Sequence, residues 1–376
     1  ESPERTRGDQ AMSRKTEILV AGGGPAGMSA AIVAAQLGAK VLLVDDNRVL
    51  GGQLVKQTHR FFGSSARDAG IRGIAIADEL QKQVAAQKKQ LTVLTETAVV
   101  GFYSDNQAGI LSHKAYEPVT YERAIVCAGA TENSLSFENN DLPGIYGAGA
   151  VQTLMNVHGI RPGKKVLMIG SGNIGLIVSY QLLQAGVDVV GLVEALPTIG
   201  GYLVHASKIR RLGVPIYTCH TIKQAIGTNH VEGAALVRID ERFQPVPNTE
   251  FQVECDCICL AVGLSPLIDL VQQGGAKMVF VPELGGLVPL HDGDMRTTSP
   301  GVYVAGDASG IEEATTAILG GRIAGARAYE SLHGKKPEAE AIVVDANNEL
   351  KTLRSGSTGE RIRWGRDRLL KEIAAC

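Results

Sequence analysis

The sequence predicts an α/β protein with two domains of the same kind. Each begins with a short apolar strand that opens into a glycine-rich turn, at Gly22 and at Gly170, and continues as a helix and a second strand. The chain has 376 residues, which exceeds the size at which single cores usually stop growing. Two such copies indicate two dinucleotide-type domains rather than a repeat solenoid.

The composition is that of an ordinary soluble globular protein, with 44% apolar and 20% charged residues. A net charge of −2 argues against a general nucleic-acid or membrane-surface binder. No apolar run reaches about 18 residues, so we expect no membrane span. We interpret the polar residues 1–14 as a disordered leader rather than a signal peptide. Six cysteines without a secretory signal favour a reducing cytoplasm.

The first glycine turn reads Gly22-x-Gly24-x-x-Gly27. The first glycine permits a tight turn, the second lets the backbone approach a pyrophosphate, and the third lets the helix pack on the strand. The pyrophosphate then lies at a helix N-terminus, where free N–H groups favour negative charge. Asp45 ends the next strand and is placed to accept hydrogen bonds from adenosine ribose hydroxyls. The expected elements are a strand over 17–20, a helix over 28–37 and a strand over 40–45.

The second glycine turn reads Gly170-x-Gly172-x-x-Gly175 and has the same context, with Glu194 at the end of the following strand. An acid there binds ribose hydroxyls and repels a 2′-phosphate, and no arginine follows it. NAD(H) is therefore favoured over NADP(H). The alternatives are that the site binds another adenine nucleotide, or that the turn only maintains the fold and binds no nucleotide. The expected elements are a strand over 165–169, a helix over 176–185 and a strand over 187–193.

Three further strands break into small residues, as backbone must where it passes close to a bound nucleotide. One ends at Ala128 and Gly129, a second ends at Gly263, and the third ends at Gly306 and Asp307. A helix over about 313–332 follows the last of them.

With two such units and the Gly306-Asp307 strand end, residues 15–332 resemble the thioredoxin-reductase-like branch of the two-dinucleotide-domain flavoprotein reductases. The resemblance implies an FAD domain split by an inserted NAD(P) domain, with Asp307 on the FAD ribitol. Gln53 and Thr58 match family residues beside the flavin, and Ala314 and Thr315 would begin the helix directed at the flavin pyrimidine. The implied domains are a first FAD segment over 15–144, an NAD(P)-type insertion over 145–264, a second FAD segment over 265–335 and a tail over 336–376.

The turns and the resemblance together give two sets of cofactor-binding residues. The FAD set is Gly22, Gly24, Pro25, Ala26, Gly27, Asp45, Asp46, Gly52, Gln53, Thr58, Val99, Ala128, Gly129, Gly306, Asp307, Ala314 and Thr315. The set for the second nucleotide is Gly170, Gly172, Asn173, Ile174, Gly175, Glu194 and Gly263.

One departure from this branch decides the chemistry. Thioredoxin reductases carry a Cys-x-x-Cys just ahead of the second glycine turn, where this chain has no cysteine over 145–153. No cysteine pair stands near Asp45 either, where the glutathione-reductase branch places one. Because a disulfide shuttle needs two thiols beside the flavin, the sequence argues against a disulfide reductase.

Residues 56–63, 129–132 and 157–159 indicate a narrower likeness. They are similar to the α-subunits of dye-linked dehydrogenases acting on opines, proline or hydroxyproline, and to the hydrogen-cyanide synthase subunit. Those resemblances imply a partner flavoprotein subunit that oxidises the amine or amino acid. One motif departs from this likeness: the family has Gly-Ala-Thr-Glu-Arg-Pro. This chain has Asn133 and Ser134 in place of the arginine and the proline.

For three groups of residues a functional role competes with a structural one. Cys255, Cys257 and Cys259 alternate on a strand, which favours core packing over a metal or redox site, and we expect no metal. His59 and His158 are candidate catalytic residues that could relay a proton, or else structural histidines. Over 351–376 seven Lys and Arg stand against three Asp and Glu, typical of a solvated helix face or a subunit-docking segment.

The sequence thus predicts an FAD-dependent oxidoreductase that exchanges electrons between NAD(H) and a partner subunit or a small amine- or amino-acid-derived substrate. The alternative is a non-catalytic, nucleotide-binding α-subunit that scaffolds a partner dehydrogenase. The expected partners are other dehydrogenase subunits or further copies of the chain.

Overall fold

The computed structural model describes residues 14–61, 68–113, 115–356 and 359–374. It has two compact units with mixed α/β structure, which confirms the predicted fold class. The first unit comprises the chain up to Val55, residues 60–131 and the residues from Ser265 onward. The second comprises Lys56–His59 and Glu132–Leu264, and is therefore inserted into the first. No helix among these described residues is both long and apolar enough to cross a membrane.

The first unit is built on a seven-stranded sheet in the order β3-β2-β1-β6-β5-β4, with β19 also paired to β6. Strand β1 is parallel to β2 and to β6, so the carboxyl ends of these strands meet at one edge. The strands of the unit are β1 (Arg14–Ala21), β2 (Val41–Val44), β3 (Leu91–Leu94), β4 (Thr97–Tyr103), β5 (Gln107–Ser112), β6 (Ala115–Val126), β17 (Met278–Val281), β18 (Gly286–Pro289) and β19 (Val302–Val304).

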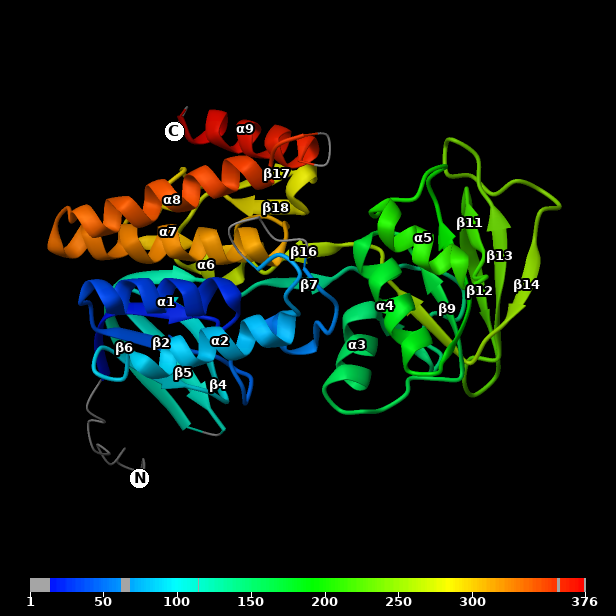
Figure 1. Cartoon of the computed structure of the whole chain (residues 1–376), viewed down its shortest axis with the longest axis horizontal. Coiled ribbons are helices and arrows are strands. Elements are labelled where there is room, and N and C mark those ends of the chain that lie inside the picture. The colour runs from blue at the N-terminus through cyan, green and yellow to red at the C-terminus, as the bar shows by residue number, and fades with distance from the viewer. Residues whose placement is uncertain (1–13, 62–67, 114, 357–358, 375–376) are drawn as a thin grey trace, which may run out of the picture. The chain divides into compact units, whose positions relative to one another are not determined.

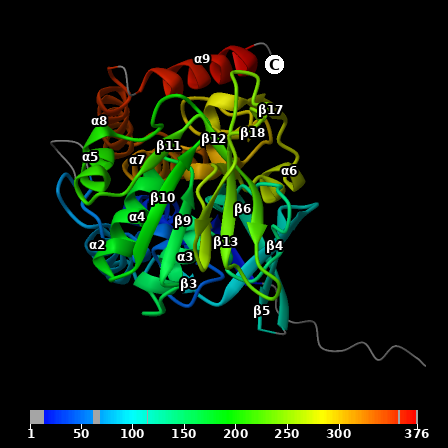
Figure 2. The same ribbon diagram turned by 90° about the vertical axis from the view of Figure 1, so that its right-hand side faces the viewer.

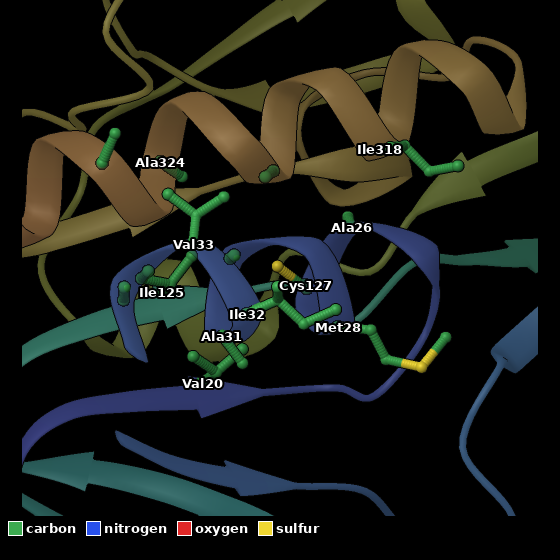
Figure 3. Packing of buried hydrophobic residues seen from close by; sticks show 14 of the residues in the cluster. Val20, Ala26, Met28, Ala31, Ile32, Val33, Ile125, Cys127, Ile318 and Ala324 are labelled. Atoms are coloured by element: carbon green, nitrogen blue, oxygen red, sulfur yellow. The ribbon is translucent and has the colours of Figure 1, made fainter. Parts of the chain in front are cut away.

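Two helices, α1 and α7, pack on each other beside this sheet, as Figures 1 and 3 show. Gly321 and Gly325 let them approach closely, because a Cβ at either position would overlap the carbonyl oxygen of Ala26 or Ala30. The helices of the unit are α1 (Pro25–Leu37), η1 (Gly52–Lys56), α2 (Gly73–Ala86), α6 (Asp269–Gln273), η2 (Pro282–Leu284), η3 (Gly306–Ser309), α7 (Ala314–His333), α8 (Pro337–Leu353) and α9 (Glu360–Ala374).

The core between α1, α7 and the sheet is continuous and apolar (Figure 3). Val20 and Ile125 from the strands and Met28 and Ile32 from α1 are all buried in this core. Burial of these side chains fixes the end of β1 under the start of α1. The first glycine turn therefore lies at a rigid junction of strand and helix.

The second unit has a five-stranded parallel sheet in the order β11-β10-β9-β15-β8, in front in Figure 2. A three-stranded antiparallel sheet, β12-β13-β14, accompanies it. Its elements are β8 (Ile145–Gly147), α3 (Ala148–Asn156), β9 (Lys165–Ile169), α4 (Asn173–Gln184), β10 (Asp188–Glu194), α5 (Leu203–Arg211), β11 (Ile216–Thr218), β12 (His220–Ile226), β13 (Gly233–Arg238), β14 (Phe251–Glu254) and β15 (Cys257–Leu260). Two short strands, β7 (Ala130–Glu132) and β16 (Leu264–Pro266), lie where the chain passes between the units.

The unit boundaries differ from the expected ones at two places. The division falls at Glu132 rather than at 145, because residues 133–144 contribute Leu135 and Phe137 to the apolar cluster of the second unit. The expected tail over 336–376 is no separate segment either. Helix α8 packs on α7 through Val343, and α9 covers the β17–β18 hairpin through Leu369 (Figure 1).

Candidate functional site

The three glycines of the first turn have different surroundings. Gly22 has a φ of 105°, and a Cβ there would overlap the carbonyl oxygen of Cys127. A Cβ on Gly27 would overlap the carbonyl oxygen of Gly22. A Cβ on Gly24 would have only Gly52 Cα near it, at 3.9 Å. The protein's own packing therefore requires glycine at 22 and 27, while the space beside Gly24 is open to a ligand.

Helix α1 begins at this open position and offers uncompensated N–H groups. Gly24 is its N-cap, Pro25 occupies the first turn, and that turn holds no acidic residue and no side-chain cap. Asp45 is buried at the end of β2 and accepts hydrogen bonds from Gly23 N and from Asn47 N. Such a turn binds an anion at the helix and hydroxyls at the acid.

The first glycine pair, Gly51 and Gly52, lies directly on the first turn. Gly51 N donates to Gly23 O at 2.8 Å, and a Cβ on Gly52 would lie 2.9 Å from Gly24 Cα. Gln53 is exposed beside the pair, and Asp46 is exposed next to Asp45. The glycine pair is therefore part of the wall of the first site.

Thr58 does not group with this wall. It belongs to the second unit, where its Oγ1 accepts a hydrogen bond from Gln181 Nε2 at 2.7 Å. The segment is held there because Lys56 Nζ donates to Gly149 O at 3.0 Å and Asn156 Nδ2 donates to Lys56 O at 2.7 Å. Thr58 is thus assigned to the second unit and Gln53 to the first.

The late Gly306-Asp307 segment comes to the same place as the first turn. A Cβ on Gly306 would lie 2.9 Å from Ala26 Cβ, so the end of β19 touches the start of α1. Burial raises the pKa of the Asp307 carboxyl to about 6. Helix α7 begins just beyond it at Ala314, with Thr315 buried and no side-chain cap.

The remaining predicted residues of the first site lie around this centre. Ala128 N would be 3.4 Å from a Cβ on Gly22, and Gly129 follows with a φ of 77°. Val99 on β4 packs with Ala128 against one apolar cluster. Within the first unit the structure therefore brings Ala128, Gly52 and Gly306 to the first turn.

The second glycine turn repeats the first in detail. Gly170 has a φ of 106°, and a Cβ there would overlap the carbonyl oxygen of Ala261. A Cβ on Gly175 would overlap the carbonyl oxygen of Gly170, whereas one on Gly172 would meet nothing within 4 Å. Gly172 is therefore the open position, at the N-terminus of α4.

Glu194 holds this turn as Asp45 holds the first. Its Oε2 accepts from Ser171 N at 3.0 Å and from Ser171 Oγ at 2.5 Å, and its Oε1 accepts from Leu196 N at 3.0 Å. Ile174 is 41% exposed beside the helix start. Gly263, with a φ of 112°, accepts a hydrogen bond through its carbonyl from Asn133 N at 3.0 Å.

The two candidate histidines have different environments. Burial, followed by the charges of His205 and Lys208, lowers the pKa of His59 to about 4. His59 is therefore neutral at neutral pH. His158 follows α3 and is exposed. A catalytic role for either one stays a prediction.

The three alternating cysteines lie in the core. Cys255, Cys257 and Cys259 are each at most 2% exposed. Burial raises the pKa of Cys255 and of Cys257 to about 12, so neither forms a thiolate readily. Within the described part of the chain no group of three or more His, Cys, Asp or Glu side chains could hold a metal ion.

Two features of the sites were not predicted from the sequence. One is Glu132, whose Oε1 accepts a hydrogen bond from Gly149 N at 2.6 Å at the start of α3, with Lys56 also on Gly149. The other is a second glycine pair, Gly200 and Gly201, on the second turn. Its signal was present in the sequence, because Ile-Gly-Gly-x-Leu-Val over 199–204 matches Leu-Gly-Gly-x-Leu-Val over 50–55.

Two open helix N-termini, each with a glycine turn and an acid bonded to that turn, define a class of protein with two nucleotide sites in one chain. A family model for pyridine nucleotide-disulphide oxidoreductases matches residues 16–321, and the chain belongs to that family. Its members are FAD- and NAD(P)-dependent oxidoreductases. The open turns and the acids described above fit both cofactors.

Curated relatives are components of larger enzymes. The chain is 28% identical over 307 residues to the α-subunit of sarcosine oxidase from Rhizobium meliloti, covering 78% of this chain and 28% of that one. It is 27% identical over 340 residues to the A-subunit of opine oxidase from Agrobacterium tumefaciens, covering 84% and 66%. It is 26% identical over 325 residues to the HcnB subunit of hydrogen cyanide synthase from Pseudomonas protegens, covering 81% and 68%. The chain thus spans only part of each relative.

Solved structures share the fold. The thioredoxin reductase of T. acidophilum superposes with a TM-score of 0.70 at 20% identity, covering 85% of this chain and 99% of that one. The L-proline dehydrogenase of P. horikoshii gives a TM-score of 0.66 at 22% identity, covering 89% and 59%.

Proposed function

We propose that the chain passes electrons between NAD(H) and a partner subunit, or a small amine- or amino-acid-derived substrate, through bound FAD. The observation that supports this best is the presence of two complete nucleotide turns, each with an open glycine and an acid that accepts hydrogen bonds from the turn. The curated relatives act on sarcosine or opines, or make hydrogen cyanide, by their names, and each is a named subunit.

The proposal excludes disulfide reduction as the reaction. The described cysteines are all free thiols, and four of the five are buried. Cys127 lies nearest the first turn, but it stands alone there and burial raises its pKa to about 12. A disulfide shuttle needs two reactive thiols beside the flavin. Free thiols also suit the reducing cytoplasm in which we place the protein.

Each site has residues for one part of its cofactor. In the first unit the α1 N-terminus at Gly24 would hold the FAD pyrophosphate, Asp45 the adenosine ribose and Asp307 the ribitol. In the second unit the α4 N-terminus and Glu194 would hold NAD(H). Bound FAD supplies the hydride and electron chemistry, and the protein orients it and excludes water.

Glu194 supports NAD(H) over NADP(H). Both carboxylate oxygens are fixed by backbone N–H groups, so the negative charge stays where an adenosine 2′-phosphate would come. No lysine or arginine stands between Glu194 and Tyr202 to offset that charge. Repulsion of the 2′-phosphate should therefore disfavour NADPH.

The direct test is anaerobic addition of NADH to the purified, FAD-loaded protein while the visible flavin absorbance is recorded. We expect NADH to bleach the flavin, and NADPH to need a concentration at least about tenfold higher because of the Glu194 charge. A flavin spectrum that NADH leaves unchanged would contradict the NADH step. It would favour the alternative function, a nucleotide-binding α-subunit without catalysis, which co-expression with a partner dehydrogenase would then reveal.

A further inference from the structure

The second glycine pair lies on the second turn as the first pair lies on the first turn. Gly201 N donates to Ser171 O at 2.9 Å, whereas in the first unit the bond to the corresponding turn carbonyl, Gly23 O, comes from Gly51 N, the first glycine of its pair rather than the second. A Cβ on Gly201 would lie 2.9 Å from Asn173 N, at the first residue of α4. The segment 200–202 therefore runs across the helix N-terminus at which we place the nucleotide's pyrophosphate.

The two pairs are anchored by different forces. Leu54, two residues after the first pair, is fully buried in the core of its unit. Leu203, two residues after the second pair, is 77% exposed, and Val204 beside it is 47% exposed. The apolar side chain two residues after the pair is thus buried in the first unit and exposed in the second, although the sequences match; Ile199, before the second pair, packs against the core of its unit.

Polar side chains of the turn hold the second pair instead. Asn173 Oδ1 accepts a hydrogen bond from Tyr202 N at 2.9 Å. Ser171 Oγ accepts one from Gly200 N at 3.3 Å. The first turn has Gly23 and Pro25 at the corresponding positions, and neither has a side chain that can accept such a bond.

We propose that Asn173, assisted by Ser171, is a positioning residue that holds segment 200–202 over the pyridine nucleotide and sets how fast that nucleotide leaves. The inference rests on the proposed function, in which the second site binds NAD(H). Asn173 and Tyr202 are both half-buried, so water competes for the hydrogen bond between them and the segment is held weakly. A weakly held segment suits a nucleotide that must dissociate at every turnover. A segment anchored by the buried Leu54 suits a cofactor that stays bound.

The test compares Asn173→Ala with Asn347→Ala, a matched control on the exposed surface of α8 in the other unit. ADP-ribose and NADH are the probes, and their dissociation is followed by stopped-flow fluorescence. Because one hydrogen bond is lost, we expect Asn173→Ala to release both probes about fivefold faster. The KM for NADH should rise by a similar factor, and by more than the rate of flavin reduction at saturating NADH falls.

Gly201→Ala is a second variant that acts on the same segment without touching Asn173. Its Cβ would press on the backbone of Gly172 and Asn173, so the segment must move away and the probes should again leave faster. FAD content is measured for every variant, because a general folding defect would lower it and a local effect would not.

The outcomes separate the inference from the proposed function. Wild-type protein that binds neither probe would overturn both. Wild-type protein that binds NADH, together with Asn173→Ala and Gly201→Ala that release it at the wild-type rate, would overturn the inference and leave the proposed function standing. A loss of flavin from Asn173→Ala would also overturn it, since the residue would then be structural.

Discussion

Single residues at the two turns divide into those that the fold requires and those that face a ligand. Gly22 and Gly27 have no room for a Cβ, whereas Gly24 and Gly172 do. The pattern Gly-x-Gly-x-x-Gly predicts this division from sequence, because each position has a fixed task in the strand–turn–helix junction. What the pattern does not predict is the protonation of a residue such as Asp307, which depends on burial by distant segments.

The burial of Asp307 predicts a pH dependence of stability. Its pKa in the folded protein is raised to about 6. Because the pKa of Asp307 is lower in the unfolded chain than in the folded protein, ionisation of its carboxyl destabilises the folded state. The free energy of unfolding of FAD-free protein should fall as the pH rises through about 4 to 6 and stay lowered above that window, by about 2 kcal/mol.

Asp307→Asn is the variant that isolates this effect. It should be more stable than wild-type protein at about pH 8 and equal to it near pH 4, since only the wild type gains a buried charge. Urea unfolding of FAD-free protein across the range gives the difference curve. Glu312 and two arginines, Arg354 and Arg366, line the same small cavity and are present in both proteins. Parallel curves for wild type and variant would show that folding does not raise the pKa of Asp307.

At the scale of elements, the C-terminal helices show how far charge patterns predict structure. The sequence of the last segment predicted a basic face that is solvated or docks onto another subunit. The structure instead buries two of its arginines on one carboxylate. Arg354 Nη2 and Arg366 Nη2 lie 2.8 and 2.7 Å from Glu312 Oε1, and Arg366 Nη1 lies 2.8 Å from His291 Nε2. The acceptor lies far back in the sequence, before α7, so no local pattern could have indicated it.

Removal of that carboxylate should strongly destabilise the first unit. In Glu312→Gln two buried guanidinium groups would lose their counter-charge, and we expect the free energy of unfolding to fall by about 3 kcal/mol. Asp345→Asn is the control, because Asp345 pairs with Arg322 at 3.2 Å but its side chain is 57% exposed. That loss should stay below about 1 kcal/mol. Equal losses in the two variants, measured by urea unfolding, would mean that the Glu312 cluster is solvated.

At the scale of the whole chain, the two units have separate cores, and under the proposed function each binds its own nucleotide. The sequence predicted both units, because the strand–turn–helix pattern is local, and the resemblance to the thioredoxin-reductase-like branch implied the insertion. It misplaced their boundary, because Lys56–His59 and residues 133–144 belong to the second unit through contacts with distant residues such as Gly149. Family likeness could not correct this, since the same short segments also resemble relatives of which the chain spans only part.

Two matched variants should each abolish one ligand's stabilisation and leave the other intact. A side chain at position 24 or 172 has room in the fold, so Gly24→Asp and Gly172→Asp should fold and place a carboxylate where a pyrophosphate binds. In wild-type protein a ligand at about one hundred times its Kd adds about 2.7 kcal/mol to the stability of the unit that binds it. Calorimetry with FAD and with ADP-ribose should show that Gly24→Asp loses only the FAD effect and Gly172→Asp only the ADP-ribose effect. If either variant lost both effects, the two sites would not be independent, and the assignment of one cofactor to each unit would be wrong.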